Sequence, residues 1–446
     1  MPRPAASSFF QTALTSVTLI TIVALAMRLF FAADYISHRP RQALSVIPFL
    51  FESGNIADSI ATGKGFSSPF HVDTGPTAWT TPVYPLLLGG IMRLFGPYTF
   101  PSYLAAVLVN IVFSSLVSIP LFSAGRIIGG TVLGASAAWL WAIFPNAILL
   151  TYESLWETCL CALLGALLLW ATLRVAESRR TRAWCAYGLL WGLALMTQAS
   201  LLSLLPFLIG WAAYRCRTRG ESRVALPALA LALTAACCIP WTIRNYTVFH
   251  SFIPLRSILG LQLWVGNNPQ AKVVWLGEQH PIHDSAEREQ YVQMGEIAYM
   301  RQKEHDALAY ILHHPAHEAA LIAGRFVSLW AGGSAAPLRD FRRSRSAWFR
   351  YVLLFNLCAA LATLAAIIRL IRERSPYTVP LASYPVIFPW AHYLTLSLPR
   401  YRHAIDPTLM LLTAYAFLHF ARLARAGRTP VRPVHGIDRS KYKDLQ

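Results

Sequence analysis

The chain has too little charge to cover itself with a water-soluble surface. Of its 446 residues only 13% are Asp, Glu, Lys or Arg, whereas 55% are hydrophobic and the mean hydropathy is +0.43. Soluble globular domains carry about 25% charged residues, so the composition excludes that class. Apolar runs of the ~20 helical residues needed to cross ~30 Å of hydrocarbon recur along most of the chain. The sequence therefore predicts an all-α, polytopic integral membrane protein.

The sequence also lacks paired cysteines and a basic polar domain. Its seven cysteines form no CxxC pair and lie in or beside apolar runs, so neither a disulfide framework nor a cysteine-bound metal is expected. The net charge of +18 comes mostly from Arg clusters between apolar runs, and no nucleic-acid-reading module accompanies them. We therefore expect no nucleic-acid partner, and the charge reports membrane topology instead.

The apolar segments predict about ten membrane-spanning helices. They lie at approximately residues 12–33, 101–124, 131–151, 155–173, 184–199, 201–214, 224–243, 351–371, 377–396 and 404–422. A further stretch, Pro82 to Phe95, has about 14 residues, which is short for a span, and we expect it to lie at the interface or to re-enter the membrane.

The polar stretches divide the chain into four parts. These are an N-terminal transmembrane module, 1–243, with a first external loop, 34–81; an external polar loop or small domain, 244–350, with an amphipathic helix around Glu287 to Leu312; C-terminal transmembrane helices, 351–425; and a basic tail, 426–446.

Arginine clusters orient these parts across the membrane. The clusters at 174–182, 215–223 and 369–374, together with the tail, fall on one side if about ten spans are counted. Because positive charge favours the cytoplasm, both termini are expected there and both long loops face outward. One further cluster lies at the outward end of the second loop: Arg339, Arg342, Arg343, Arg345 and Arg350. Long loops escape the charge rule, and a cationic rim suits a phosphate, so this cluster is a possible site.

The first external loop carries four acidic residues, which are candidates for a general base. They are Asp34, Glu52, Asp58 and Asp73. Burial beside the membrane raises the pKa of a carboxyl group toward the operating pH of a general base. The alternative interpretation is that these acids simply solvate a polar loop of about 48 residues.

The same loop resembles that of a known enzyme family. From residue 51 it reads FESGNIADSIATGKGFSSPFHVDTGPTAWTTPVYPLLLGG, an acidic residue followed by an Ala-rich helix, a Gly-x-Gly-aromatic turn and a Pro-rich entry to an apolar segment. This pattern resembles the first external loop of GT-C fold membrane glycosyltransferases, including the protein O-mannosyltransferases and the bacterial aminoarabinose transferase. The resemblance extends through AWLWAIFP, SLWET, PWTIRNYTVF, LWVGNNP and PRYRHAIDP, and suggests a bacterial branch of glycosyltransferase family 39.

The resemblance implies a specific chemistry. The donor is a polyprenyl-phosphate-linked sugar, the acceptor is reached from the outer face of a bacterial inner membrane, and a first-loop acid deprotonates the acceptor during an inverting displacement. On this sequence that acid is Glu52. Many members carry a tandem Asp-Glu a few residues before the matching helix, where this chain has Pro48 and Phe49. Asp58 and Asp73 therefore stay open as alternatives, with Asp34 behind them.

A lipid phosphate needs fixed positive charge near the outer interface. The predicted topology places Arg244, Arg256, Arg400 and Arg402 there, and a guanidinium can hold a phosphate through two parallel hydrogen bonds. The alternative is that Arg244 and Arg400 extend from helix ends to lipid headgroups. The resemblance favours the Arg400, Tyr401, Arg402 triplet, since a basic residue before a late span meets the donor phosphate in that family.

Other polar residues are weaker candidates for substrate contacts. Glu157, near the outward end of a span, either positions a sugar hydroxyl or sits in the interface beside Trp156. Asn267 fits a turn, or else hydrogen bonds to an acceptor. Trp79 and Trp264 either anchor the membrane interface or stack on a sugar.

A metal site is not expected. His280, His283 and Asp284 include a His-x-x-His spacing, but a zinc site needs further ligands at suitable positions. We therefore expect neither a metal nor a cofactor.

A multi-span transporter or flippase is the main alternative function, and a non-catalytic assembly protein is the third. A transporter of a lipid-linked or small solute also has many spans and a few intramembrane charges. The chain lacks paired broken spans in matching halves, however, and its two long loops both face outward on the predicted topology. These features favour chemistry at the membrane surface over alternating access.

Overall fold

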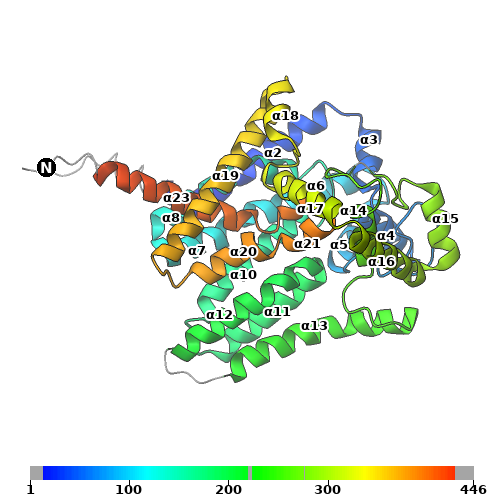
Figure 1. The fold of residues 1–446 in the computed structure, drawn as a ribbon, viewed down its shortest axis with the longest axis horizontal. Coiled ribbons are helices and arrows are strands. Elements are labelled where there is room, and N and C mark those ends of the chain that lie inside the picture. Colours follow the sequence, from blue (N-terminus) through cyan, green and yellow to red (C-terminus); the bar gives the residue numbers. More distant parts are fainter. Residues whose placement is uncertain (1–13, 219–223, 276, 427–446) are drawn as a thin grey trace, which may run out of the picture.

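The described part of the protein is helical throughout. The computed structural model describes residues 14–218, 224–275 and 277–426. Within these ranges no strand occurs, and the only extended pairing is an isolated antiparallel bridge between Ser67 and Pro76. The all-α prediction is therefore confirmed (Figure 1). Of the predicted basic tail only Ala426 falls within the described residues, and the second half of the 215–223 cluster lies outside them.

Long apolar helices form the body of the molecule. Within the described ranges six segments are long and apolar enough to cross a membrane. They are α2 (Val17–Ser37), α6 with α7 (Phe100–Leu116 and Ser118–Gly129), α10 (Thr158–Val175), η2 with α12 (Ala199–Leu204 and Leu205–Thr218), α13 (Ala225–Phe249) and α19 (Ala347–Arg372). The polytopic membrane fold is confirmed, and Pro82 to Phe95 contains the short helix α5 (Val83–Phe95), whose place at the interface or within the membrane stays a prediction.

The remaining predicted spans correspond to α23 (Asp406–Ala426), a continuous helix of 21 residues, and to shorter or broken helices, and the total of ten stays a prediction. The shorter or broken helices are α8 (Thr131–Ala142) with α9 (Pro145–Leu149), α11 (Thr181–Thr197), and α20 (Thr378–Ile387) with α21 (Trp390–Leu394).

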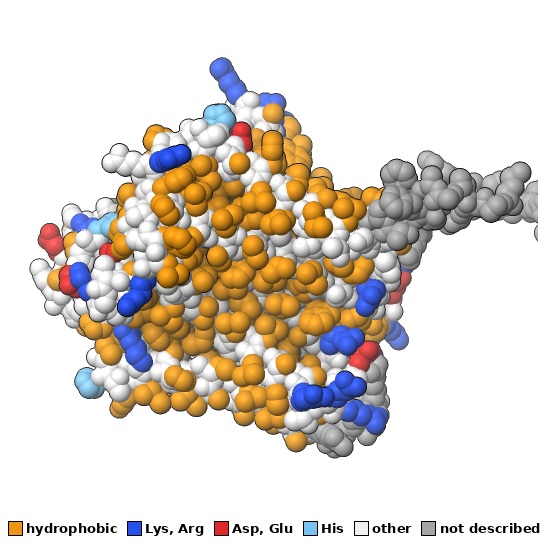
Figure 2. Space-filling model, turned by 180° about the vertical axis from the view of Figure 1, so that it is seen from behind, with side chains coloured by type: hydrophobic (Ala, Val, Ile, Leu, Met, Phe, Trp, Pro, Cys, Tyr) orange, Lys and Arg blue, Asp and Glu red, His pale blue; other side chains and the backbone are white. Residues whose placement is uncertain are grey.

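The helical body presents a broad apolar surface. Figure 2 shows one face covered by hydrophobic side chains, with Lys and Arg gathered toward its margins. Large hydrophobic residues exposed on the helices include Ile239 and Ile243 of α13 and Leu361 and Ile371 of α19. Surfaces of this extent are unfavourable in water and are suited to lipid contact.

The two long polar loops also fold mainly into helices. The first contains α3 (Arg41–Val46), the turn η1 (Ile47–Phe49) and α4 (Glu52–Ala61); the second contains α14 (Leu259–Gly266), α15 (Ser285–Met294), α16 (Glu296–His313), α17 (Pro315–Trp330) and α18 (Pro337–Arg343). The expected continuous helix from Glu287 to Leu312 is two helices, because Gly295 adopts a left-handed φ of 76° and ends α15. Helices α4, α14, α15 and α16 gather at one end of the molecule (Figure 1, right).

A buried carboxylate joins these two external regions. Glu296 accepts hydrogen bonds from the backbone N–H of Ala78 at 2.8 Å and from Ser257 Oγ at 2.6 Å through one oxygen. Its other oxygen accepts from Tyr291 at 2.8 Å and from Thr77. Because hydrogen bonds to an ionised acceptor are strong, this residue fixes the first loop against the second.

A glycine sets the position of the chain before the last helix. A Cβ added at Gly165 of α10 would collide with the carbonyl oxygen of Ala404, so the backbones approach each other closely here. Tyr384 donates a hydrogen bond to the carbonyl of Gly165 at 2.8 Å. These contacts hold the segment containing the short helix α22 (Pro399–Arg402) next to the N-terminal end of α10.

Candidate active site

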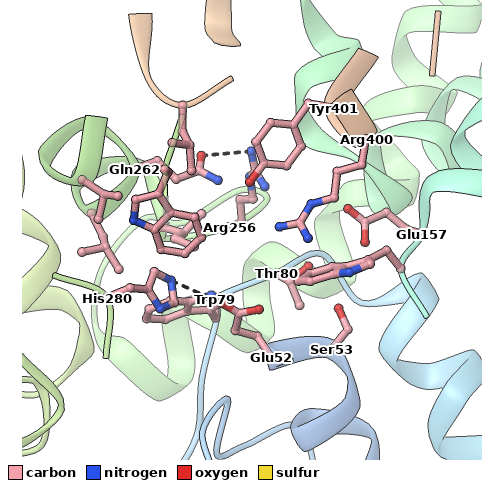
Figure 3. A pocket seen from close by; sticks show the side chains of 16 residues that line it. Glu52, Ser53, Trp79, Thr80, Glu157, Arg256, Gln262, His280, Arg400 and Tyr401 are labelled. Atoms are coloured by element: carbon pink, nitrogen blue, oxygen red, sulfur yellow. Dashed lines mark hydrogen bonds and ion pairs between the residues drawn. The ribbon is translucent and has the colours of Figure 1, made fainter. Parts of the chain in front are cut away.

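A pocket lies where the first external loop, the second external loop and α22 meet. It encloses about 670 Å³ of space including its open mouth. Its walls are Glu52, Ser53, Trp79, Thr80, Trp156, Glu157, Arg256, Ile258, Leu261, Gln262, Val265, Trp275, His280, Leu396, Arg400 and Tyr401. Two carboxylates and two guanidiniums therefore share one partly aromatic cavity (Figure 3).

Glu52 is presented by the first turn of α4. The backbone at Phe51 is extended and the helix begins at Glu52, so the carboxylate sits near unpaired N–H groups of the helix N-terminus. A Cβ at Gly54 would collide with the carbonyl of Phe49, which shows how tightly the chain turns into α4. Only 9% of Glu52 is exposed, and this burial raises the pKa of its carboxyl group, while the positive charge of Arg400 opposes the rise.

His280 faces Glu52 across the pocket floor. Its Nε2 lies 3.3 Å from Glu52 Oε1, and its Nδ1 accepts a hydrogen bond from the backbone N–H of Ile282 at 3.2 Å. Burial lowers the pKa of His280 to about 3. The indole rings of Trp79 and Trp275 pack edge-on against the imidazole, with centroids 5.6 and 5.4 Å away.

Arg400 reaches into the pocket from α22. Its guanidinium carbon lies 3.9 Å from the ring centroid of Trp156 and 5.2 Å from that of Tyr401. Its Nε is buried and makes no hydrogen bond to any described residue. An arginine that is stacked on an aromatic ring and still has a free donor is ready to bind an anion.

Arg256 and Glu157 complete the charged wall. Arg256, in the segment before α14, donates from Nη2 to Gln262 Oε1 at 3.4 Å, and burial lowers its pKa. Glu157 is the residue before α10, and burial raises the pKa of its carboxyl group against the opposing charges of Arg400 and Arg256. Figure 3 shows the Glu157 carboxylate beside the Arg400 guanidinium.

A second pocket of about 640 Å³ adjoins the first. The two share Glu52, Trp156, Trp275 and Arg400 as lining residues. The second pocket adds Phe51, Gly277, Ile282, His283 and Leu398. Glu52 and Arg400 thus stand at the junction of two cavities, where two different molecules can be brought together.

Three predicted substrate-binding residues, Arg244, Asn267 and Arg402, lie outside the pocket and stabilise the fold. Arg244 donates to the carbonyls of Thr77 and Phe66 at 2.6 and 2.8 Å and so anchors the first loop. Asn267 accepts from Arg325 at 3.0 Å and donates to the carbonyl of Leu394 at 2.9 Å.

Arg402 is buried, in contrast to its neighbour Arg400. It donates to Asp406 Oδ1 at 2.7 Å, to the carbonyl of Leu329 at 2.8 Å and to Asn356. Its guanidinium is therefore fully engaged with the protein, whereas Arg400 and Tyr401 line the pocket.

The other acids of the first loop line neither cavity. Asp58 follows Glu52 by six positions, which places it on a different face of α4. Asp73 is exposed and accepts hydrogen bonds from Gly75 N–H at 3.2 Å and Ser68 at 3.1 Å, which lower the pKa of its carboxyl group. Asp34 is exposed beside His38.

The remaining candidates divide between the pocket and other parts of the structure. Trp79 lines the pocket, whereas Trp264 packs against Lys303, whose Nζ is 5.6 Å from its ring. Asp284 caps the N-terminus of α15, and no three His, Cys, Asp or Glu side chains cluster as metal ligands within the described ranges. The cluster of Arg339, Arg342, Arg343, Arg345 and Arg350 is exposed on and after α18 and lines neither pocket.

Sequence reasoning considered His280 only as a metal ligand. Its pairing with Glu52 joins the two external regions and has no signal in local sequence. Trp275 and Gln262 were likewise not predicted as pocket residues. Their location in the second polar loop was the only feature of the sequence that could have indicated them.

Comparison with known proteins supports the motif-based resemblance. Residues 79–243 match the model of the dolichyl-phosphate-mannose-protein mannosyltransferase family. This range includes Trp79, Trp156 and Glu157 of the pocket. A search of the curated proteins gives no significant match.

Two solved structures share the fold at low sequence identity, and a third is less similar in structure. The oligosaccharyltransferase of Archaeoglobus fulgidus tethered to an acceptor peptide is 13% identical with a TM-score of 0.52, over 93% of this chain and 51% of that chain. The same archaeal enzyme, AglB, in complex with an inhibitory peptide and a dolichol-phosphate, is 12% identical with a TM-score of 0.51, over 92% of this chain and 52% of that one. ArnT from Cupriavidus metallidurans bound to undecaprenyl phosphate is 14% identical with a TM-score of 0.38, over 94% and 80%.

The chain spans about half the length of the archaeal enzyme. The fold and the family match agree with the resemblance read from the loop motifs. The protein is therefore an all-α polytopic membrane protein that shares its fold with the archaeal oligosaccharyltransferase, and its residues 79–243 match the model of the dolichyl-phosphate-mannose-protein mannosyltransferase family.

Proposed function

We propose that the protein transfers a sugar from a polyprenyl-phosphate-linked donor to an acceptor at the outer face of a bacterial inner membrane, with inversion and without a metal ion. The observation that carries the proposal is the junction of two cavities at Glu52 and Arg400. A buried carboxylate and a stacked guanidinium with a free donor supply the base and the anion-binding group that such a transfer needs.

Glu52 acts as the general base in the transfer. It accepts the proton of the acceptor nucleophile as that atom attacks the anomeric carbon of the donor sugar. The bond between this carbon and the phosphate oxygen breaks, and its electron pair stays on the polyprenyl phosphate. The raised pKa of Glu52 makes its carboxylate a stronger base than that of an exposed glutamate.

Arg400 and Arg256 stabilise the leaving group. The donor phosphate carries about one negative charge and the departing phosphate about two, so the interaction with a fixed guanidinium strengthens as the reaction proceeds. The dolichol-phosphate in the archaeal AglB complex is a lipid phosphate of the class proposed here. Glu157, beside Arg400, is suited to hold a sugar hydroxyl, and Tyr401 and Trp79 contribute to the walls around the sugar.

The arrangement of the helices supports an outward-facing site. Helix α10 begins next to Glu157 at the pocket and ends beyond Arg174, at the opposite end of the bundle. Helix α19 similarly has Arg369 and Arg372 in its last turn. Because arginine clusters favour the cytoplasmic side, we place the pocket and both polar regions outside and both termini inside.

The proposal keeps the four-part division of the chain. Residues 1–243, including the loop 34–81, supply the base and Glu157, the region 244–350 supplies Arg256 and His280, the helices within 351–425 supply Arg400, and the tail 426–446 is cytoplasmic.

The test is transfer of radiolabelled sugar from a panel of polyprenyl-phosphate donors to membrane acceptors. The wild type is compared with Glu52→Gln at matched protein levels, and Asp58→Asn serves as a matched control on the same helix. We expect transfer by the wild type and the control, and at least a hundredfold loss in Glu52→Gln. Loss in Asp58→Asn or Asp73→Asn with activity retained in Glu52→Gln would reassign the base. Absence of transfer from every donor would favour a transporter or flippase of lipid-linked solutes.

A further inference from the structure

His280 is a buried histidine whose ring has a defined orientation. Its exposure is 7%, and the indoles of Trp79 and Trp275 hold the ring edge-on. The backbone N–H of Ile282 donates to Nδ1 at 3.2 Å. A nitrogen that accepts a hydrogen bond carries no proton, so the proton of the neutral ring is on Nε2.

The protonated nitrogen of this ring is the one that faces the proposed base. Nε2 lies 3.3 Å from Glu52 Oε1, and Figure 3 shows the two side chains pointing toward each other across the floor of the pocket. A doubly protonated imidazole would direct a second N–H against the N–H of Ile282, which is unfavourable. The pair is therefore a neutral N–H donor facing a carboxylate, rather than an ion pair or a proton relay.

On this basis we propose that His280 is a positioning residue: its Nε2–H donates to one oxygen of Glu52 and leaves the other oxygen directed at the acceptor nucleophile. The inference rests on the proposed role of Glu52 as base. Without the donor the carboxylate is free to rotate, and its ionised form loses a stabilising hydrogen bond. His280 itself neither gains nor loses a proton during the transfer.

Removing the donor has a defined consequence for the pH profile. The other titratable or charged groups that face Glu52 in the two cavities are Arg400, Tyr401, Arg256, Glu157 and His283. None of them is altered by replacing His280, so the change in the pKa of Glu52 reports the lost N–H. Since that bond stabilises the carboxylate, its loss raises the pKa of Glu52. The acid limb of the pH profile of kcat/KM then moves to higher pH, by about one pH unit.

The experiment compares His280→Phe, which keeps a ring without a donor, with His280→Gln, whose amide nitrogen occupies the place of Nε2. His71→Phe, at an exposed position lining neither pocket, is the control. Each purified full-length variant is checked for a monodisperse profile, and sugar transfer from the polyprenyl-phosphate donor is measured from pH 5 to pH 9.

We expect kcat of His280→Phe to fall tenfold or more and the acid limb of its kcat/KM profile to lie at higher pH than in the wild type. His280→Gln and His71→Phe should keep the acid limb at the pH of the wild type. A folded His280→Phe with an unshifted limb, or equal losses in Phe and Gln with no shift, overturns the positioning role while the proposed function stands. A wild type that transfers no sugar, or an active Glu52→Gln, instead overturns the proposed function or its base, and the role of His280 with it.

Discussion

Arg400 offers the most direct test of how the pocket handles a phosphate. Its guanidinium is stacked 3.9 Å from the centre of Trp156, and its Nε is buried without a protein partner, so binding a phosphate requires no existing bond to break. A donor aimed at charge that develops in the transition state contributes ~3 kcal/mol, which is about a hundredfold in rate. Arg400→Ala should therefore lower kcat/KM for the lipid-linked donor by about two orders of magnitude.

Arg400→Lys separates charge from geometry. The lysine keeps the positive charge but loses both the planar fork and the stacking on Trp156, so we expect an intermediate loss of about tenfold. The assay is the initial rate of sugar transfer over a range of donor concentrations, with Arg339→Gln, an exposed arginine on α18, as the control. Full activity in Arg400→Ala, or equal activity of the Ala and Lys variants, would refute the assignment of a bidentate phosphate contact.

Two further predictions follow from buried carboxylates. Because burial raises the pKa of Glu52, kcat/KM of the wild type should fall about tenfold per pH unit below that pKa, with the midpoint above the ordinary glutamate value of 4.5. The carboxyl group of Glu52 also holds its proton more tightly in the folded than in the unfolded protein. Its contribution to folding stability is therefore lost as the pH rises from the unfolded pKa through the folded pKa. Glu296→Gln replaces one of the two acceptor oxygens with an NH2 group, which then faces the donors of Thr77 and Tyr291 or those of Ala78 and Ser257, and it should lower the free energy of unfolding by about 2–3 kcal/mol. Thermal unfolding in detergent measures this, and an equal melting temperature for Glu296→Gln and the exposed Glu304→Gln would contradict it.

Hydropathy and local motifs predicted the membrane fold well, because both act over short stretches of sequence. The short apolar stretch Pro82 to Phe95 contains a helix of 13 residues, and its predicted place at the interface or re-entering the membrane stays a prediction. The expected helix from Glu287 to Leu312 was wrong in one respect, since apolar periodicity continues across Gly295 while the backbone does not. Periodicity reports which face of a segment is buried, and it is insensitive to a single residue with positive φ.

The candidate site was only partly predictable, because it depends on side-chain direction and on contacts between distant segments. Arg400 and Arg402 lie two positions apart on a short helix, about 200° around its axis, so one reaches the pocket while the other is buried against Asp406. Local sequence does not distinguish the two arginines. The pairing of Glu52 with His280 is likewise a product of tertiary packing, since each residue belongs to a different polar region.

The origin of the pocket walls has a consequence for how the protein matures. Glu52 emerges early in synthesis, His280 emerges after most of the helices, and Arg400 emerges just before the last one. The cavity beside Glu52 is therefore complete only when α22, which supplies Arg400 and Tyr401, has been synthesised. A chain that stops at Leu396 would retain nearly all of its membrane helices and still lack two walls of this cavity. The proposed active site is thus completed near the end of translation.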